Sequence, residues 1–264
     1  AMLLCSLSTA VEAQESNCSF RNTAFKSGEF LSYNLYYNWK FVWVKAGTAS
    51  MSLVQRNYKG TPAYRAALLT SGSERADRYF VLRDTILCYS SLGLEPLYFR
   101  KGSRHDKQYT VDEVFYSYAN NKPTLKQHRQ RRDGEHEWKT TTFNECVYDM
   151  LNIVLRARSF NPEGWKTGNT ISFTIADGRH IQKALLRYNG KKVVKADNGK
   201  KYRCLELSYL EQEEKKNKEI IRFFVTDDSN HVPIRLDMFL KFGSAKAFLV
   251  GMKGIKNAIA SEVQ

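Results

Sequence analysis

The chain of 264 residues combines a hydrophobic fraction of 42% with an aromatic fraction of 13% and a formal net charge of +14. This content of Phe, Tyr and Trp excludes a disordered chain, and five cysteines are too few for a disulfide-dense miniprotein. The excess of Lys and Arg favours partners that carry phosphate or carboxylate groups.

The N-terminal residues 1–13 predict a secretory signal peptide. They open with an uncharged apolar run that reaches Val11, and the small residues Val11 and Ala13 have the spacing at which signal peptides are cleaved. No basic residue precedes the run, so we expect the printed sequence to start inside the signal. A buried N-terminal strand or helix is the alternative. Export predicts a periplasmic or outer-membrane-associated protein.

Alternating apolar and polar residues predict strands over most of the first half. The pattern is clearest at residues 31–40, where aromatic and aliphatic side chains alternate with Ser, Asn and Lys. A second strand runs to Val54, and Gly47 and Ala49 in its middle leave room for a neighbour or mark a bend. Further strands are predicted at residues 63–70, 86–90, 96–101, 108–118 and 123–131.

Two helices are predicted between the strands. Ser71 and Glu74 have the spacing of a capping box, which predicts a short helix of two or three turns. Asn144 is a suitable cap for a longer helix at residues 145–159, whose apolar positions follow the helical repeat from Val147 onward. This second helix would present one apolar face to a sheet.

The second half of the chain returns to strands, predicted at residues 170–176, 180–188, 191–196, 202–211, 218–226, 232–242 and 245–253. The fold class is therefore mainly β: a large curved antiparallel sheet, open or a half-barrel, wrapped around one amphipathic helix, with a short second helix.

We assign residues 18–256 to a single β-rich domain. A similar pattern around Tyr64 and Tyr202 further predicts two related halves, at about residues 28–140 and 165–254, joined by the long helix. Chance similarity among many Tyr and Arg residues is the alternative.

Cleavage of the signal would leave four cysteines, which allow three disulfide pairings, and the sequence selects none of them: Cys18, Cys88, Cys146 and Cys204. Buried free thiols are the alternative. The chain has no Cys-x-x-Cys pair and no two histidines at zinc-ligand spacing. We therefore expect no metal site and no cofactor.

The chain contains no G-x-S-x-G, S-x-x-K or H-E-x-x-H motif and no phosphate-binding loop, so we expect it not to be an enzyme. A glycan-acting hydrolase is the less favoured alternative, because it would need two carboxyl groups facing each other across a sugar. Three acid pairs are candidates: Asp112/Glu113, Asp227/Asp228 and Glu135/Glu137. The second of these is more typical of a turn.

Basic residues gather at 122–132 and 183–203. Solvated edge strands explain such segments without any function, whereas a functional interpretation is an anionic partner. Aromatic residues gather in a predicted hairpin at residues 33–43. One face of this hairpin belongs to the core, and the other has the composition to hold an acyl chain or to stack on sugars.

Several motifs resemble those of the exported bacterial proteins called domain of unknown function 3108. They include Gly28-Glu29-Phe30-Leu31, Ala46-Gly47-Thr48-Ala49 and Phe80-Val81-x-x-Asp84. The segments that start at Cys146-Val147-Tyr148 and Phe224-Val225-Thr226 look like the Bacteroides-type members. The resemblance covers nearly all of residues 18–254 and implies export and a β-rich fold, but it implies no activity and no catalytic residue. By looser analogy, such chains look like periplasmic carriers in which an open barrel wraps a helix and leaves an apolar cavity.

These observations favour a non-enzymatic binding protein of the bacterial envelope. Its ligand would be an amphiphilic or anionic molecule, such as a lipid, a lipopolysaccharide or an acidic glycan, held in the curved sheet, and export argues against nucleic acid. An envelope interaction or scaffold module that uses a basic surface is the alternative. Local charge and aromatic content select the candidate ligand-binding residues Tyr36, Trp39, Trp43, Arg100, Lys101, Arg104, Arg129 and Arg131.

Overall fold

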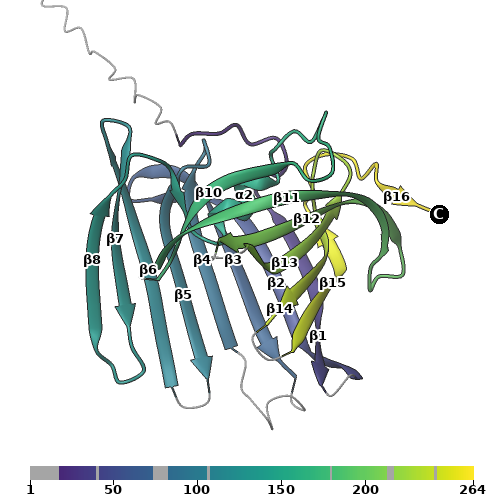
Figure 1. Cartoon of the computed structure of the whole chain (residues 1–264), viewed down its shortest axis with the longest axis horizontal. Coiled ribbons are helices and arrows are strands. Elements are labelled where there is room, and N and C mark those ends of the chain that lie inside the picture. Colours follow the sequence, from purple (N-terminus) through teal and green to yellow (C-terminus); the bar gives the residue numbers. More distant parts are fainter. Residues whose placement is uncertain are drawn as a thin grey trace, which may run out of the picture.

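The computed structural model describes residues 18–39, 42–73, 83–105, 108–178, 180–212, 217–240 and 243–264. The predicted signal peptide lies outside these residues. The described chain is mainly β, as predicted, and its strands belong to one large open sheet (Figure 1). In the part of the chain that the structure describes, no helix is both long enough and apolar enough to span a membrane.

The first half forms an antiparallel meander in which each strand pairs with the next. Its strands are β1 (Glu29–Trp39), β2 (Val42–Tyr58), β3 (Thr61–Gly72), β4 (Arg83–Ser91), β5 (Pro96–His105), β6 (Gln108–Ala119), β7 (Lys122–Gln130) and β8 (His136–Thr142). Tight turns connect several of these strands. Asn120 and Asn121 both have positive φ, 51° and 60°, which is the backbone that a two-residue hairpin between β6 and β7 requires.

The second half forms a second meander, preceded by a short helix. Its elements are β9 (Val147–Tyr148), α2 (Asn152–Ala157), β10 (Thr170–Asp177), β11 (His180–Lys195), β12 (Lys201–Gln212), β13 (Asn217–Thr226), β14 (Pro233–Phe239), β15 (Ser244–Lys253) and β16 (Glu262–Val263). β1 pairs with β15 and thereby joins the two meanders, so that the strand path runs from β8 through β1 and β15 to β9. The sheet does not close, since β8 and β9 lie at opposite ends of this path.

The sheet curls so that the second meander crosses the inner face of the first, with α2 between them (Figure 1). Contacts between distant segments support this arrangement: the Gln127 side-chain amide donates to the Gly178 carbonyl, and the Tyr116 hydroxyl donates to Asp149 across 3.3 Å. The inner faces of both meanders form one apolar core, which includes the fully buried Phe99 and Ile234. The relationship predicted between the two halves stays a prediction.

The long helix predicted at residues 145–159 is wrong. Val147 and Tyr148 instead pair in parallel with β10, and the helix is the six-residue α2. The reason lies at Asp149, whose carboxylate accepts the backbone N–H groups of Leu151 at 3.0 Å and Asn152 at 2.9 Å. These two bonds satisfy backbone N–H groups at the start of α2, so the helix begins only after the strand β9 has ended. The core inside the sheet includes Leu151 and Leu155 at α2, and the described part of the chain places no long helix there.

Three other boundaries differ from the predictions. Ser71 lies in β3, so no helix starts there, and residues 74–82 of that predicted helix lie outside the described residues. The two strands predicted at 180–188 and 191–196 are one strand, β11, because a bulge with Gly190 at φ 111° lets the strand continue. The polar edge strand β8 has no clear alternation and was not predicted.

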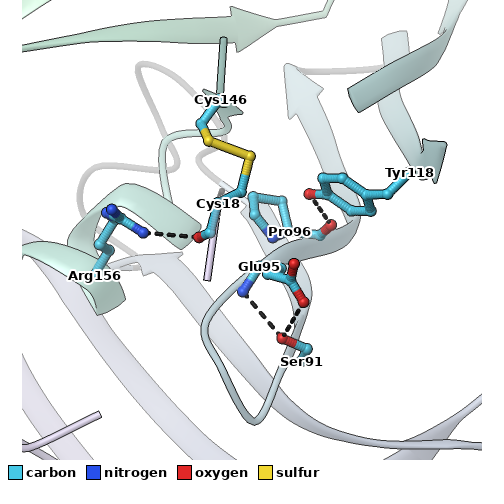
Figure 2. The surroundings of a disulfide bond; sticks show 7 residues. All are labelled: Cys18, Ser91, Glu95, Pro96, Tyr118, Cys146 and Arg156. Carbon is cyan, nitrogen blue, oxygen red and sulfur yellow. Dashed lines mark hydrogen bonds between the residues drawn. A yellow bond between two sulfur atoms is a disulfide. The ribbon is translucent and has the colours of Figure 1, made fainter. Parts of the chain in front are cut away.

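One disulfide fastens the N-terminal segment to the start of the second half. Cys18 and Cys146 are bonded, with their Cα atoms 5.4 Å apart, and Arg156 of α2 donates to the Cys18 carbonyl at 2.8 Å (Figure 2). Cys88 and Cys204 are buried free thiols. The structure therefore contains one of the possible disulfides together with the free thiols that were the alternative.

Candidate binding pocket between α2 and the second meander

An apolar pocket of about 150 Å³ lies between α2 and the inner face of strands β10 to β13. Alternation along the strands supplies its lining: Leu205 and Leu207 of β12 pair directly with Val225 and Phe223 of β13, so these four side chains share one face. Other apolar lining residues come from α2, its following loop and the neighbouring strands: Ile153, Val154, Ala157, Phe160, Trp165, Phe173, Ile175, Leu186, Ile220 and Ile221.

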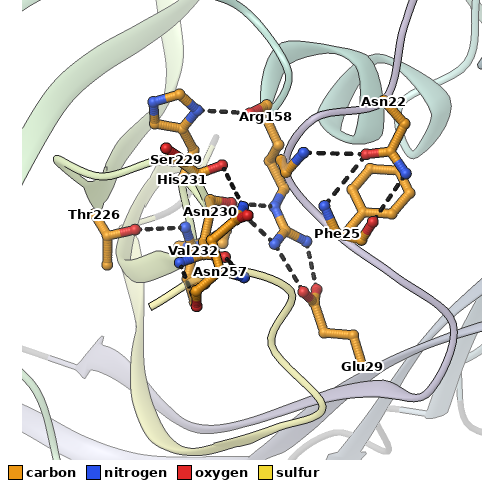
Figure 3. Close-up of polar contacts among 12 residues, drawn as sticks. Asn22, Phe25, Glu29, Arg158, Thr226, Ser229, Asn230, His231, Val232 and Asn257 are labelled. Atoms are coloured by element: carbon orange, nitrogen blue, oxygen red, sulfur yellow. Dashed lines mark hydrogen bonds and ion pairs between the residues drawn. The ribbon is translucent and has the colours of Figure 1, made fainter. Parts of the chain in front are cut away.

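A buried ion pair holds the end of α2 over this pocket. Arg158 follows α2 directly, and its two terminal nitrogens donate to the two carboxylate oxygens of Glu29 on β1, one of them at 2.9 Å (Figure 3). The same guanidinium donates to the carbonyl of Asn230 at 3.1 and 3.2 Å. Both charged side chains are at most 2% exposed. The Arg158 charge is therefore neutralised by the protein itself.

His231 supplies a polar atom to the pocket lining. Its Nδ1 lies 2.6 Å from the carbonyl oxygen of Arg158 (Figure 3). Because a carbonyl can only accept, Nδ1 carries the proton, and Nε2 of the neutral ring keeps a lone pair. Burial lowers the pKa of His231, so the ring stays neutral at neutral pH. The residue also has an unusual φ of 43°.

The charged groups at the pocket are mainly acidic. Asp177 and Glu211 belong to the lining, whereas no lysine does, and Arg158 is the only arginine among the described lining residues. Since Glu29 already pairs with Arg158, the described lining residues offer no unpaired Lys or Arg to an anionic ligand. Its polar groups suit an uncharged hydroxyl or an amine better than a carboxylate or a phosphate.

The sequence-predicted basic residues do not lie in this pocket. Strand alternation places them on two faces of the sheet. Arg100 and Arg104 lie on the same face as Glu113. Lys101 and Arg129 lie on the other face, where both are cross-strand neighbours of Asp112. Arg131 lies beyond β7 and pairs with Glu135 and Glu137. These residues therefore do not form the single basic rim that the sequence suggested.

Two of the three aromatic residues predicted for the ligand, Tyr36 and Trp43, do not line this pocket. Tyr36 packs edge-on against Phe248, and its hydroxyl donates to Asp197 at 2.8 Å. Trp43 is 38% exposed, with the Lys246 ammonium 4.2 Å from its ring centre. Trp39 ends β1, and its side chain lies outside the described part of the structure.

The three acid pairs are occupied by local contacts. Asp112 and Glu113 point to opposite faces of β6, near Arg129 and His128 respectively. Asp228 accepts the Asn230 amide at 3.0 Å within a turn, and Asp227 pairs with Lys191 and Arg203. Glu135 and Glu137 both pair with Arg131. In the described structure, none of the three pairs faces its partner across the apolar pocket.

The sequence predicted an apolar site in the curved sheet and the strands that line the pocket, but none of its candidate ligand-binding residues is among the described lining residues. The alternation in β12 and β13 identifies Leu205, Leu207 and Phe223 as residues of one sheet face. That α2 covers this face depends on the contact of Arg158 with Glu29, which are 129 residues apart. No local signal in the sequence indicates that contact.

One family model and several solved structures are similar to this chain. A family model described as "Protein of unknown function (DUF3108)" matches residues 32–250, which confirms the family resemblance. The chain is similar to the crystal structure of a beta-barrel-like protein of domain of unknown function DUF1849 from Brucella abortus. The TM-score is 0.57 at 12% identity, covering 89% of this chain and 100% of that chain. At this identity the similarity shows the fold alone.

Two further solved structures are more distant. One is a candidate exported protein with a YmcC-like fold from Bacteroides fragilis, with a TM-score of 0.36 at 11% identity over 89% of this chain and 100% of that one. The other is a candidate lipoprotein from Parabacteroides distasonis, with a TM-score of 0.34 at 10% identity over 90% of this chain and 100% of that one. No curated protein matches the chain.

Proposed function

Because the chain belongs to the DUF3108 family, whose description assigns no activity, we propose a function from the pocket: the protein binds the hydrocarbon part of an amphiphile between α2 and β10–β13. The observation that carries the proposal is the mainly apolar lining contributed by α2, the loop that follows it and the strands β10 to β13. Apolar concave sites with a few polar groups are typical of small-molecule binding.

The size of the pocket limits what it holds. A volume of about 150 Å³ is below the roughly 300–1,000 Å³ of pockets that enclose whole drug-sized ligands. The pocket therefore suits a short alkyl segment, with the rest of the molecule outside. Its polar end would meet His231, Asp177 or Glu211, so we propose an uncharged or amino head group at this end in place of an anionic one.

We place this binding protein in the bacterial envelope. The Cys18–Cys146 disulfide supports an oxidising compartment, because cytosolic thiols are kept reduced. The predicted signal peptide points the same way. A non-enzymatic role is part of this proposal.

Three ligands with the same chain and different head groups test the pocket: 1-octanol, octylamine and octanoate. Each is titrated by NMR while the indole N–H resonance of Trp165, a lining residue, is followed. We expect 1-octanol and octylamine to shift this resonance and to bind more tightly than octanoate. If none of the three shifts it, the pocket proposal fails. If octanoate binds best, the head-group assignment alone fails.

A pocket-filling variant provides the second arm of the test. Val154→Trp on α2 puts an indole into the pocket and should weaken 1-octanol binding by at least ~10-fold, about 1.4 kcal/mol. Val193→Trp is the matched control, because Val193 is 60% exposed on β11 and does not line the pocket. Circular dichroism confirms that both variants fold. Equal loss in the two variants would contradict the proposed site.

A further inference from the structure

A row of aromatic rings crosses the outer face of the first meander, on the side of the sheet opposite to the core. We call it the outer aromatic row and define it as Tyr58, Tyr89, Tyr98, Phe115 and Trp138. Successive ring centres lie 4.7, 6.4, 5.1 and 6.3 Å apart. The rings therefore contact each other in series from the end of β2 to the edge strand β8.

The rings of the outer aromatic row do not belong to the hydrophobic core. Tyr89, Tyr98 and Phe115 are direct cross-strand neighbours, and the residues that alternate with them on the inner face include the fully buried Cys88 and Phe99. The outer face of such a sheet usually carries polar side chains, yet Trp138 is 54% exposed here. A contiguous set of half-exposed rings on an open face is typical of a binding surface.

Cations flank the row on both sides. Arg65 is the cross-strand neighbour of Tyr89 at one end, and Lys126 is the neighbour of Phe115 at the other. The Lys126 ammonium lies 4.7 Å from the Trp138 ring centre, and Lys59 lies 5.5 Å from that of Tyr58. These three positive charges give the row a positive potential.

Glu113, an acidic residue on this face, already contacts neighbouring side chains. Glu113 accepts the Tyr98 hydroxyl and lies 2.7 Å from His128 Nδ1, while Arg100 approaches it at 3.9 Å. Its carboxylate oxygens face Tyr98, His128 and Arg100, so in the described structure Glu113 forms no ion pair with Lys59, Lys126 or Arg65. The surface therefore combines ring faces or edges with cations that an anionic partner can reach.

We propose that the outer aromatic row binds an acidic polysaccharide chain, with sugar C–H groups against the rings and sugar carboxylates against Arg65, Lys59 and Lys126. The row is one ring wide, its ring centres lie 4.7 to 6.4 Å apart, and Arg65 of β3 and Lys126 of β7 lie beside its rings. Such a narrow, positively charged strip suits a linear anionic chain. A protein partner would need a broad patch of about 800 Å² with an apolar centre, which a single row does not supply. This site is independent of the pocket.

The probe is a hexamer of galacturonic acid, and its methyl ester, which has the same backbone without the charges, is the matched ligand control. Isothermal titration calorimetry at low and moderate salt measures both. We expect the acid form to bind, the ester to bind at least ~10-fold more weakly, and added salt to weaken the acid form. Equal binding of the two forms, or binding of neither, would overturn the proposal.

Two tryptophan variants locate the site. Trp138→Ala should weaken hexamer binding by ~10-fold, because it removes the most exposed ring of the row. Trp43→Ala is the control, because Trp43 is also an exposed indole beside a lysine, Lys246, but lies outside the row. Equal effects of the two variants would overturn the assignment. Self-association that Trp138→Ala abolishes, without sugar binding, would also overturn it and identify the row as an interface between copies.

Discussion

Glu29→Gln should destabilise the protein strongly, because it leaves the Arg158 guanidinium buried without its counter-charge. Both side chains of the pair are at most 2% exposed, so solvent cannot compensate. Glutamine has nearly the same volume as glutamate, so the loss is electrostatic and creates no cavity. The remaining bonds of Arg158 to the Asn230 carbonyl do not neutralise a full positive charge.

Removing one partner of a buried pair costs about 3–5 kcal/mol, a large part of the roughly 5–15 kcal/mol that stabilises a typical domain. For a chain of this size, that loss lowers the melting temperature by roughly 6–20 °C. Urea unfolding followed by circular dichroism gives the free energy of unfolding, and an unchanged m-value shows that the denatured state is unaffected.

A double-mutant cycle with Arg158→Met separates charge imbalance from lost packing. If the unpaired charge causes the loss, the double variant is less destabilised than the sum of the two single variants by about 1–3 kcal/mol. Additive losses, or a loss below about 1 kcal/mol for Glu29→Gln alone, would refute this reasoning. Since the pair also positions α2 over the pocket, the single variant should bind 1-octanol more weakly at a temperature where it remains folded.

Three more measurements test other parts of the fold. Reducing the Cys18–Cys146 disulfide releases a loop closed over 128 residues and should lower the free energy of unfolding by about 5 kcal/mol, as urea unfolding with and without dithiothreitol would show. Burial raises the pKa of Asp149 to about 6, whereas an aspartate in the unfolded chain has a pKa of about 3.9. The folded protein therefore holds the Asp149 proton more tightly than the unfolded chain does. The resulting stabilisation is complete below about pH 4 and is lost as the pH rises to 6. The wild-type protein should therefore gain about 3 kcal/mol relative to Asp149→Asn between pH 7 and pH 4, and a pH-independent difference would contradict the shift. Finally, a Cβ atom added at Gly47 would lie 2.1 Å from the Ser71 carbonyl oxygen. Gly47→Ala should therefore force β2 and β3 apart and lower the free energy of unfolding by about 1–3 kcal/mol, which thermal unfolding would measure. An unchanged melting temperature would argue against this close approach.

The sequence by itself determined most of the strands, because a half-buried strand imposes a two-residue alternation that is local. It identified β1, β12 and β13 almost to their ends, and Asp227-Asp228 as a turn. The same local reasoning failed at residues 145–159. There, apolar residues at helical spacing also fit a short strand followed by a short helix, and the Asp149 carboxylate decides between the two.

Only the tertiary structure decided where the candidate sites lie. The pocket exists because Glu29 and Arg158, far apart in the chain, hold α2 over one face of the second meander. The outer aromatic row exists because strand register places Tyr98 between Tyr89 and Phe115. Side-chain alternation says that two residues share a face of one strand, whereas their neighbours on other strands depend on pairing between distant segments, which local sequence patterns do not encode.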